Sequence, residues 1–195
     1  MQARTATSDE VPALARSLAA AFEADPVFGW LIPRGSGRRG RLERFFRLEL
    51  EHIVLPAGAA WTTGELPGAA LTLPPGRWKT PPRVTLGHGP EAVRVFGRRT
   101  GHGLGLLTRM ESRHLREPHW YFPYIGVAPA QQGRGLGRTL MEPVLDRCDR
   151  ERLPAYLEAT SPDNARLYRR LGFREVETVT FAGSPPLLAM RRPPA

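Results

Sequence analysis

Residues 131–140, QQGRGLGRTL, place glycines at positions 133, 135 and 137 directly before an apolar helical pattern. The run before these residues, HWYFPYIGV at 119–127, is aromatic and β-rich, and predicts a buried strand interrupted near Pro123. A strand that passes through a glycine-rich turn into a helix presents unpaired backbone N–H groups at the positive end of the helix dipole. The segment therefore predicts an anion-binding loop.

Three kinds of phosphate-binding loop compete for this pattern. A Walker A loop requires G-x-x-x-x-G-K-[ST], and no lysine follows the last glycine here. The dinucleotide fingerprint G-x-G-x-x-G requires glycine where this chain has Arg138, and it normally follows an early strand. The third pattern, Q/R-x-x-G-x-G/A, is matched from Gln132 to Gly137.

A second motif stands downstream in NARLYRRLGF, residues 164–173, which fits N-x-x-x-Y-x-x-x-G-F on the helix after the next strand. With both motifs, the chain from about His119 to its C-terminus resembles the GNAT superfamily of N-acetyltransferases. The resemblance implies a mixed α/β (α+β) fold whose mostly antiparallel sheet of about six to seven strands is flanked by helices. It also implies one domain over 1–195, with a variable acceptor-side half at 1–118 and an acetyl-CoA-binding core at 119–195.

The resemblance further implies how acetyl-CoA, the acyl-donor substrate, would be held. Backbone N–H groups of 133–138 would cradle the pyrophosphate, and the strand end at 125–127 would pair with the pantetheine arm. The Val127 N–H would face the thioester carbonyl. The implied acetyl-CoA-binding residues are Ile125, Gly126, Val127, Gln132, Gly133, Arg134, Gly135, Leu136, Gly137, Arg138 and Asn164.

Two side chains are the candidates for catalysis. The resemblance points to Tyr168, one helical turn after Asn164, as the acid that protonates the departing thiolate. Glu158 is the preferred general base, with His119 or a relayed water as alternatives, because the strand parity cannot be read from sequence. Many family members carry asparagine where this chain has Ser161, which can instead cap the helix. The implied reaction is direct transfer of acetyl to an amine of a small molecule or peptide in a ternary complex.

Composition leaves two rival interpretations open. The net charge of +9 and pI near 11.0 admit nucleic acid, a membrane surface or an anionic ligand as partners. The basic stretches lack interleaved aromatic residues and helix-turn-helix or zinc-finger spacing, which argues against nucleic acid. The rivals are a non-catalytic acyl-CoA-binding sensor or scaffold of the same fold and, in second place, a basic nucleic-acid-binding protein. A homodimer stays open.

The lone Cys148 excludes an internal disulfide and is expected in the core. The histidines show no metal-ligand spacing, so no metal is expected. No apolar run reaches the roughly eighteen residues of a membrane span, and the start lacks a signal-peptide core, which predicts a cytoplasmic protein with no membrane contact.

Apolar periodicity and turn residues outline the rest of the chain. We expect helices at 8–24 (capped by Ser8) and 41–55, interrupted helices within 74–118 after a loop at 74–83, a helix to Arg150 that contains Pro143, and a helix at 161–173. We expect strands at 59–65, 68–76, 155–160, 174–181 and 186–192. The bulky residues considered for an acceptor pocket are Phe28, Trp30, Phe45, Trp61 and Trp78.

Overall fold

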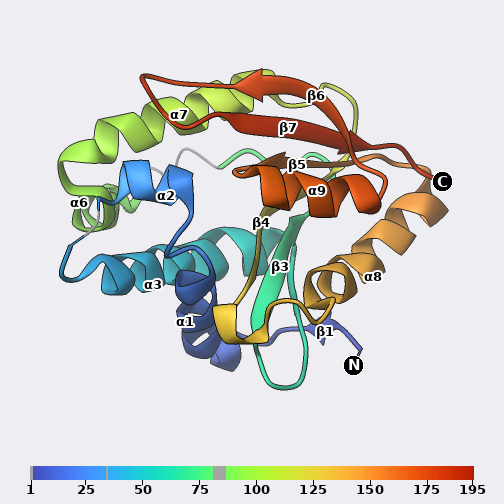
Figure 1. The fold of residues 1–195 in the computed structure, drawn as a ribbon, viewed down its shortest axis with the longest axis horizontal. Helices are drawn as coiled ribbons and strands as arrows, with labels where there is room; N and C mark the ends of the chain where they lie inside the picture. Colours follow the sequence, from blue (N-terminus) through green and yellow to red (C-terminus); the bar gives the residue numbers. More distant parts are fainter. Residues whose placement is uncertain (1, 34, 81–86) are drawn as a thin grey trace.

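The strands form one mixed sheet. The computed structural model describes residues 2–33, 35–80 and 87–195. Seven strands follow the order β1-β2-β3-β4-β5-β7-β6 (Figure 1), and all neighbours are antiparallel except β4 and β5. The strands are β1 Arg4–Thr5, β2 Ala59–Thr62, β3 Gly68–Leu73, β4 Trp120–Val127, β5 Ala155–Ala159, β6 Arg174–Val179 and β7 Leu187–Arg192. The expected mixed α/β fold with a mostly antiparallel sheet is confirmed.

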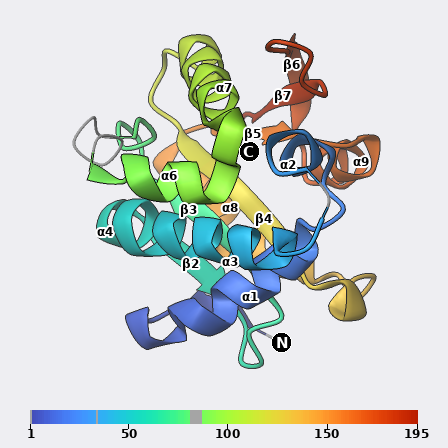
Figure 2. The same ribbon diagram turned by 90° about the vertical axis from the view of Figure 1, so that its left-hand side faces the viewer.

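Helices cover both faces of the sheet. α1, α3 and α6 lie over one face, and α8 lies behind the sheet in the same view (Figure 2). The helices are α1 Val11–Ala21, α2 Pro26–Leu31, α3 Arg38–Leu48, α4 Leu55–Ala57, α6 Gly89–Phe96, α7 Thr100–Arg113, α8 Leu136–Glu151 and α9 Pro162–Arg170. A π-helical segment, Glu49–Val54, joins α3 to α4. No helix in the described ranges is long and apolar enough to cross a membrane.

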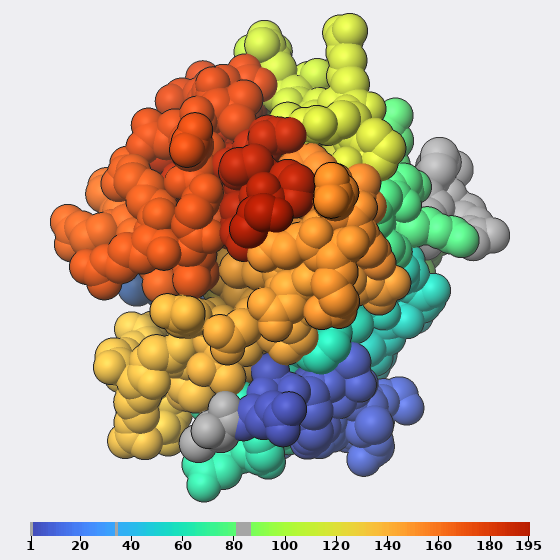
Figure 3. All heavy atoms as spheres, turned by 90° about the vertical axis from the view of Figure 1, so that its right-hand side faces the viewer, coloured from blue at the N-terminus to red at the C-terminus, as the bar shows by residue number. Residues whose placement is uncertain are grey.

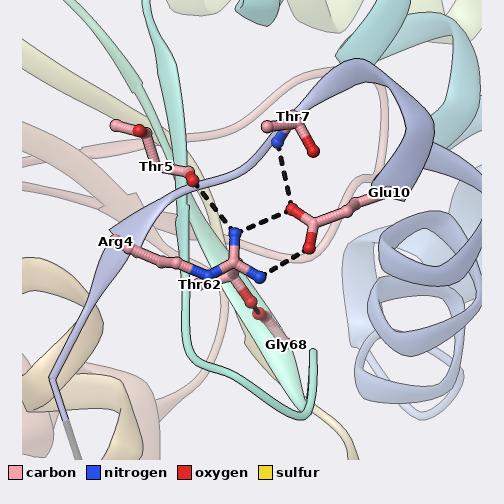
Figure 4. A network of polar contacts seen from close by, with 6 residues as sticks. All are labelled: Arg4, Thr5, Thr7, Glu10, Thr62 and Gly68. Carbon is pink, nitrogen blue, oxygen red and sulfur yellow. Dashed lines mark hydrogen bonds and ion pairs between the residues drawn. The ribbon is translucent and has the colours of Figure 1, made fainter.

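The N-terminal segment differs from the expectation. Thr7, not Ser8, starts the first helix, because its N–H donates to the Glu10 carboxylate at 3.0 Å, as in a capping box. Arg4 lies on the other side of Glu10 and pairs with the same carboxylate at 2.9 Å (Figure 4). Arg4 belongs to β1, a two-residue strand that the sequence did not predict. The contact ties this short edge strand to the start of the helical layer.

Several element boundaries also differ. The first helix ends at Ala21, and the segment expected only to break it contains α2, whose first turn is capped by Asp25 through a 2.9 Å bond from the Phe28 N–H. The second helix begins at Arg38 rather than Arg41 and continues through the π-helical segment. The two strands after it end at Thr62 and Leu73, earlier than expected.

The C-terminal half follows the expectation closely. Pro143 lies inside α8, and Cys148 on that helix is fully buried, as predicted. The Ser161 hydroxyl accepts from the Asn164 N–H at 3.2 Å, so Ser161 caps α9 as predicted. Of the loop expected at 74–83, residues 81–83 lie outside the described residues.

Candidate active site

A β-bulge divides β4. Leu73 of β3 lies opposite Tyr121, but Leu71 lies opposite Tyr124, so two residues of β4 face one residue of β3. The extra residue is at Pro123, which has no N–H to lose from the ladder. Such a bulge bends its strand and increases its twist. This is the interruption that the sequence predicted near Pro123.

Beyond the bulge, β4 leaves β5. The two strands pair at Trp120 with Ala155 and at Tyr121 with Tyr156, and no further pair joins these two fully described strands. The C-terminal ends of two neighbouring parallel strands therefore part from each other. A gap opens in the middle of the sheet.

The register shows which backbone groups border the gap. Ala128 donates its N–H to Pro67 at 2.8 Å, and directly opposed pairs in an antiparallel ladder alternate between hydrogen-bonded and non-hydrogen-bonded. Gly126 therefore directs its N–H and C=O toward β3. Ile125 and Val127 direct theirs away from β3, to the side on which β5 has turned away.

The glycine loop follows directly and ends at the N-terminus of α8. Gly133 and Gly135 have φ of 79° and 76°, a conformation that favours glycine, and Gly135 is the N-cap. Gly137 has a different role, since a Cβ there would lie 3.2 Å from the Leu167 Cδ2 of α9. The first turn of α8 leaves backbone N–H groups without helical acceptors.

The side chains of the loop point in different directions. Gln132 donates from its amide to the Val127 carbonyl at 2.9 Å, so it fixes the turn against the strand end. Arg134 and Arg138 are exposed, and the one ion pair of Arg138 with a described residue is long, 3.7 Å to Glu142 of the next turn. Leu136 is buried, so only its backbone is available to a ligand. In Figure 3 the loop, coloured yellow-orange, forms part of the surface near the blue N-terminal segment.

Helix α9 places Asn164 and Tyr168 on the same side of the gap. The Asn164 amide donates to the Thr160 hydroxyl at 3.4 Å, and Thr160 donates to the half-buried carboxylate of Asp25. Tyr168 is 6% exposed, and burial, with the nearby charge of Asp25, raises the pKa of its phenol above its usual value of 10.0. Tyr168 therefore keeps its proton at neutral pH.

The side chain of Glu158, on β5, lies on the opposite face of the sheet from Tyr168. It shares a sheet face with Tyr121, whose hydroxyl donates to Glu158 Oε2 at 2.9 Å. Burial is the main cause that raises the pKa of Glu158 to about 7, and the hydrogen bond from Tyr121 opposes it. The structure therefore shows which face of the sheet the Glu158 side chain occupies, a question that the sequence left open. Its carboxyl group titrates near neutral pH, where a general base is useful.

Two hydrogen-bonded histidines, His114 and His119, lie next to Glu158. The Nδ1 of His119 lies 2.7 Å from the Glu117 carbonyl, which can only accept, so this nitrogen carries the proton. In the neutral ring, His119 Nε2 then accepts from His114 Nδ1 at 2.9 Å. His114 Nε2 is left with a lone pair, and Trp78 stacks on this ring at 4.0 Å. His119 itself is 1% exposed and lies one ring farther from the gap than His114.

One cavity of about 490 Å³ connects these groups. Tyr121, Tyr124 and Glu158 line it from the face that carries α1 and α3, while Ile125 and Tyr168 line it from the face that carries α8 and α9. The cavity therefore passes through the sheet where β4 and β5 part. Two reactants that enter from opposite faces can meet in it.

The aromatic residues considered for an acceptor pocket are divided by the structure. Phe28, Phe45 and Trp78 line the cavity. Trp61 packs instead toward the α8 face, and Trp30 contacts the His102 ring at 5.4 Å. Sequence reasoning overlooked the cavity residues Glu49, Tyr121, Tyr124 and Thr160. It also overlooked Asp25, which accepts a hydrogen bond from Thr160, although DPVF at 25–28 carries a recognisable helix-cap signal.

The chain matches the model of the Acetyltransferase (GNAT) family over residues 75–173, just over half of its length. This range contains both the glycine loop and the motif on α9. The chain belongs to this family, and it is an acetyltransferase by class.

Individual relatives agree. The chain is 29% identical over 185 residues to an uncharacterized N-acetyltransferase of Schizosaccharomyces pombe, covering 89% of this chain and 74% of the relative. It is 39% identical over 77 residues to the mycothiol acetyltransferase of Acidothermus cellulolyticus, covering 38% of this chain and 24% of the relative. A crystal structure from Corynebacterium glutamicum, titled histone acetyltransferase HPA2 and related acetyltransferase, superposes with a TM-score of 0.74 at 28% identity and covers 100% and 96% of the two chains.

Proposed function

We propose that this protein transfers the acetyl group of acetyl-CoA to a primary amine by direct attack within a ternary complex. The observation that carries the proposal is the cavity through the sheet, which joins Tyr168 and the strand end at Ile125 on one face to Glu158 on the other. A donor and an acceptor can each occupy one face and react in the gap between β4 and β5.

The residues of the α8 side fit acetyl-CoA. The two glycines of positive φ and the first turn of α8 offer N–H groups to a pyrophosphate at an exposed surface, and Arg134 and Arg138 add positive charge beside it. The outward C=O of Ile125 and N–H of Val127 fit the amide groups of a pantetheine arm, which would extend the ladder that β5 has left, while the Val127 C=O accepts from Gln132. Gly126 would contribute through its small size, because its own polar groups face β3. Asn164, on α9, would contact the arm from the other side.

Each step of the chemistry then has a group of this chain in reach. Glu158 removes a proton from the acceptor ammonium, and the free amine attacks the thioester carbonyl carbon. The N–H of Ile125, which lines the cavity and points away from β3, stabilises the negative charge that develops on the carbonyl oxygen. Val127, the residue expected in this role from the sequence, is not among the described residues that line the cavity. As the C–N bond forms and the C–S bond breaks, Tyr168 gives its proton to the leaving thiolate, and the second proton that the attacking nitrogen loses restores the Tyr168 phenol. The products are an N-acetylated amine and coenzyme A.

A charge reversal in the loop tests where the donor binds. Gly135→Glu places a carboxylate where the pyrophosphate is proposed to bind and should abolish the affinity for acetyl-CoA measured by calorimetric titration. Gly183→Glu is the matched control, since Gly183 has φ of 75° and open space around it but lies in the turn between β6 and β7. Both variants carry the same left-handed backbone cost of about 1–2 kcal/mol.

Transfer to an amine separates the transferase from a non-catalytic acyl-CoA sensor. With acetyl-CoA and a panel of primary amines, the wild-type protein should release coenzyme A in step with acetylated product. Tight binding of acetyl-CoA with no transfer to any amine would support the sensor, and equal binding by wild type and Gly135→Glu would remove the loop from the donor site.

A further inference from the structure

The charged groups that line the cavity are acidic, although the protein as a whole has a net charge of +9. The chain carries 28 lysine and arginine residues, yet none of those in the described ranges lines the cavity. Two carboxyl groups do line it, Glu158 at the gap and Glu49 at the start of the π-helical segment. The remaining wall is mainly aliphatic and aromatic and includes the imidazoles of His52 and His88, whose ring centroids are 4.2 Å apart.

Glu49 has no partner in this wall. No hydrogen bond or ion pair joins its carboxyl group to another described residue, and its surroundings include Phe45, Leu48 and Ile53. Desolvation alone raises its pKa to about 8, although part of the residue stays accessible from the cavity. A carboxyl group in an apolar wall costs free energy unless a counter-charge or donor satisfies it.

The two carboxyl groups are separate points of one cavity. Burial, and then the charges of Glu49 and of Glu158, raise the pKa of Tyr124 far above its usual value, so the Tyr124 side chain lies within electrostatic range of both. Glu49 is on the helical layer and Glu158 is on the sheet, with Tyr124 on the intervening strand. A single amine needs only one of them.

We propose that the acceptor carries two basic groups joined by an apolar body, with the reacting amine at Glu158 and the second cation bound by Glu49. This inference rests on the proposed function and adds the substrate class. The aromatic and aliphatic wall would enclose the body of the acceptor, and Glu49 would select for the distal positive charge and against a distal carboxylate. The arginines of the outer surface oppose this selection only weakly, because salt screens exposed charges beyond about 8–10 Å.

The test uses unbranched α,ω-diamines of increasing length. Each diamine is compared with the monoamine and the amino acid of the same chain length, with acetyl-CoA saturating. At the favoured length, kcat/KM should be at least about tenfold higher for the diamine than for the monoamine, equivalent to about 1.4 kcal/mol, and lowest for the amino acid. Glu49→Gln should remove most of the preference for the diamine over the monoamine.

Glu51→Gln is the matched control. Glu51 lies on the same segment with an exposed carboxylate outside the cavity lining, so its loss should leave the preference unchanged. A loss of kcat/KM for diamine and monoamine by the same factor in Glu49→Gln would show a structural role only and overturn the inference, as would equal rates with both amines at every length.

Failure of the proposed function gives a different result. In that case acetyl-CoA does not bind, or no amine is acetylated. The inference about Glu49 is then tested by calorimetric affinities of the same diamines and monoamines. The wild-type protein should bind the diamine more tightly than the monoamine, and Glu49→Gln should remove most of that difference. Equal affinity for diamine and monoamine would overturn the inference even if transfer to other acceptors were found.

Discussion

The Nε2 atom of His114 lies 4.0 Å from Oε1 of Glu158, and neither atom has a hydrogen-bond partner among the described residues. Because His114 donates its other nitrogen's proton to His119, this Nε2 offers a lone pair to the carboxyl group. A protonated Glu158 can donate to that lone pair, whereas an ionised Glu158 gains nothing from it. The pair therefore favours the protonated carboxyl group before substrate binds.

The rate should follow the ionisation of Glu158. As a base it must be ionised, and its pKa is about 7, so kcat/KM with a monoamine, which has no distal cation for Glu49 to bind, should rise about tenfold per pH unit below pH 7 and level off above it. The other groups that face it are Tyr121 and Tyr156, both with raised pKa values, and His114, whose pKa burial lowers to about 3. None of these titrates near neutral pH. Glu158→Gln should remove the rise of kcat/KM below pH 7 and most of the rate. A wild-type kcat/KM that does not change with pH through neutrality would contradict the role of Glu158 as the general base.

The same carboxyl group should lower the stability of the fold at alkaline pH. Its folded pKa of about 7 lies above the unfolded value of 4.5, so the protonated form stabilises the native state below pH 4.5 and this contribution is lost as pH rises to 7. Glu158→Gln should therefore raise the free energy of unfolding at pH 8 by up to about 3 kcal/mol and change it little at pH 4. Urea unfolding at both values measures this. Equal effects at the two values would show that ionisation is not involved.

Tyr168→Phe should separate chemistry from binding. The variant lacks only the hydroxyl, so acetyl-CoA affinity should stay near the wild-type value while kcat falls by about 100-fold or more. The rise of kcat/KM with pH should persist, because it belongs to Glu158. A fall in acetyl-CoA affinity with kcat unchanged would instead make Tyr168 a binding residue.

Gly126→Ala should destabilise the protein through crowding. A Cβ at this position would lie 2.8 Å from Phe22 Cε2 and 3.1 Å from Leu18 Cδ2, and the Phe22 ring is held by Phe28, Phe46 and Tyr124. The expected cost is about 1–3 kcal/mol in urea unfolding. Gly40→Ala, an exposed position in α3 with open space around it, should gain about 0.5–1 kcal/mol. Stabilisation by both changes would show that α1 can move away from β4.

The sequence predicted best where local chemistry determines structure. The glycine loop, the Ser161 cap and the motif on α9 each act within a few residues, and the structure has the predicted elements there. The mostly antiparallel mixed sheet flanked by helices followed from the resemblance, and the structure has it. The proposed donor-binding residues from Ile125 to Arg138 stay a prediction.

The acceptor side could not be predicted in the same way. Glu49 lies one helical turn after Phe45, so periodicity places both on one side of the helix, but the cavity on that side exists only because α6 and α7 pack around it. Asp25 and Thr160 are distant in sequence and meet only when α2 packs beside the end of β5. Which face of the sheet the Glu158 side chain occupies depends on how β5 pairs with β4 and β7, and the sequence of β5 alone does not specify that pairing.

The bulge at Pro123 also determines what a one-residue deletion would do. Tyr121 and Tyr124 share one face of the sheet, and Phe122 and Ile125 share the other, so a chain without Pro123 would alternate regularly and keep each of these side chains on its present face. What the deletion would remove is the bend. β4 would then continue its ladder along β5, and the sheet would close with its core intact. A single inserted residue therefore accompanies the difference between a continuous sheet and one whose central strands part.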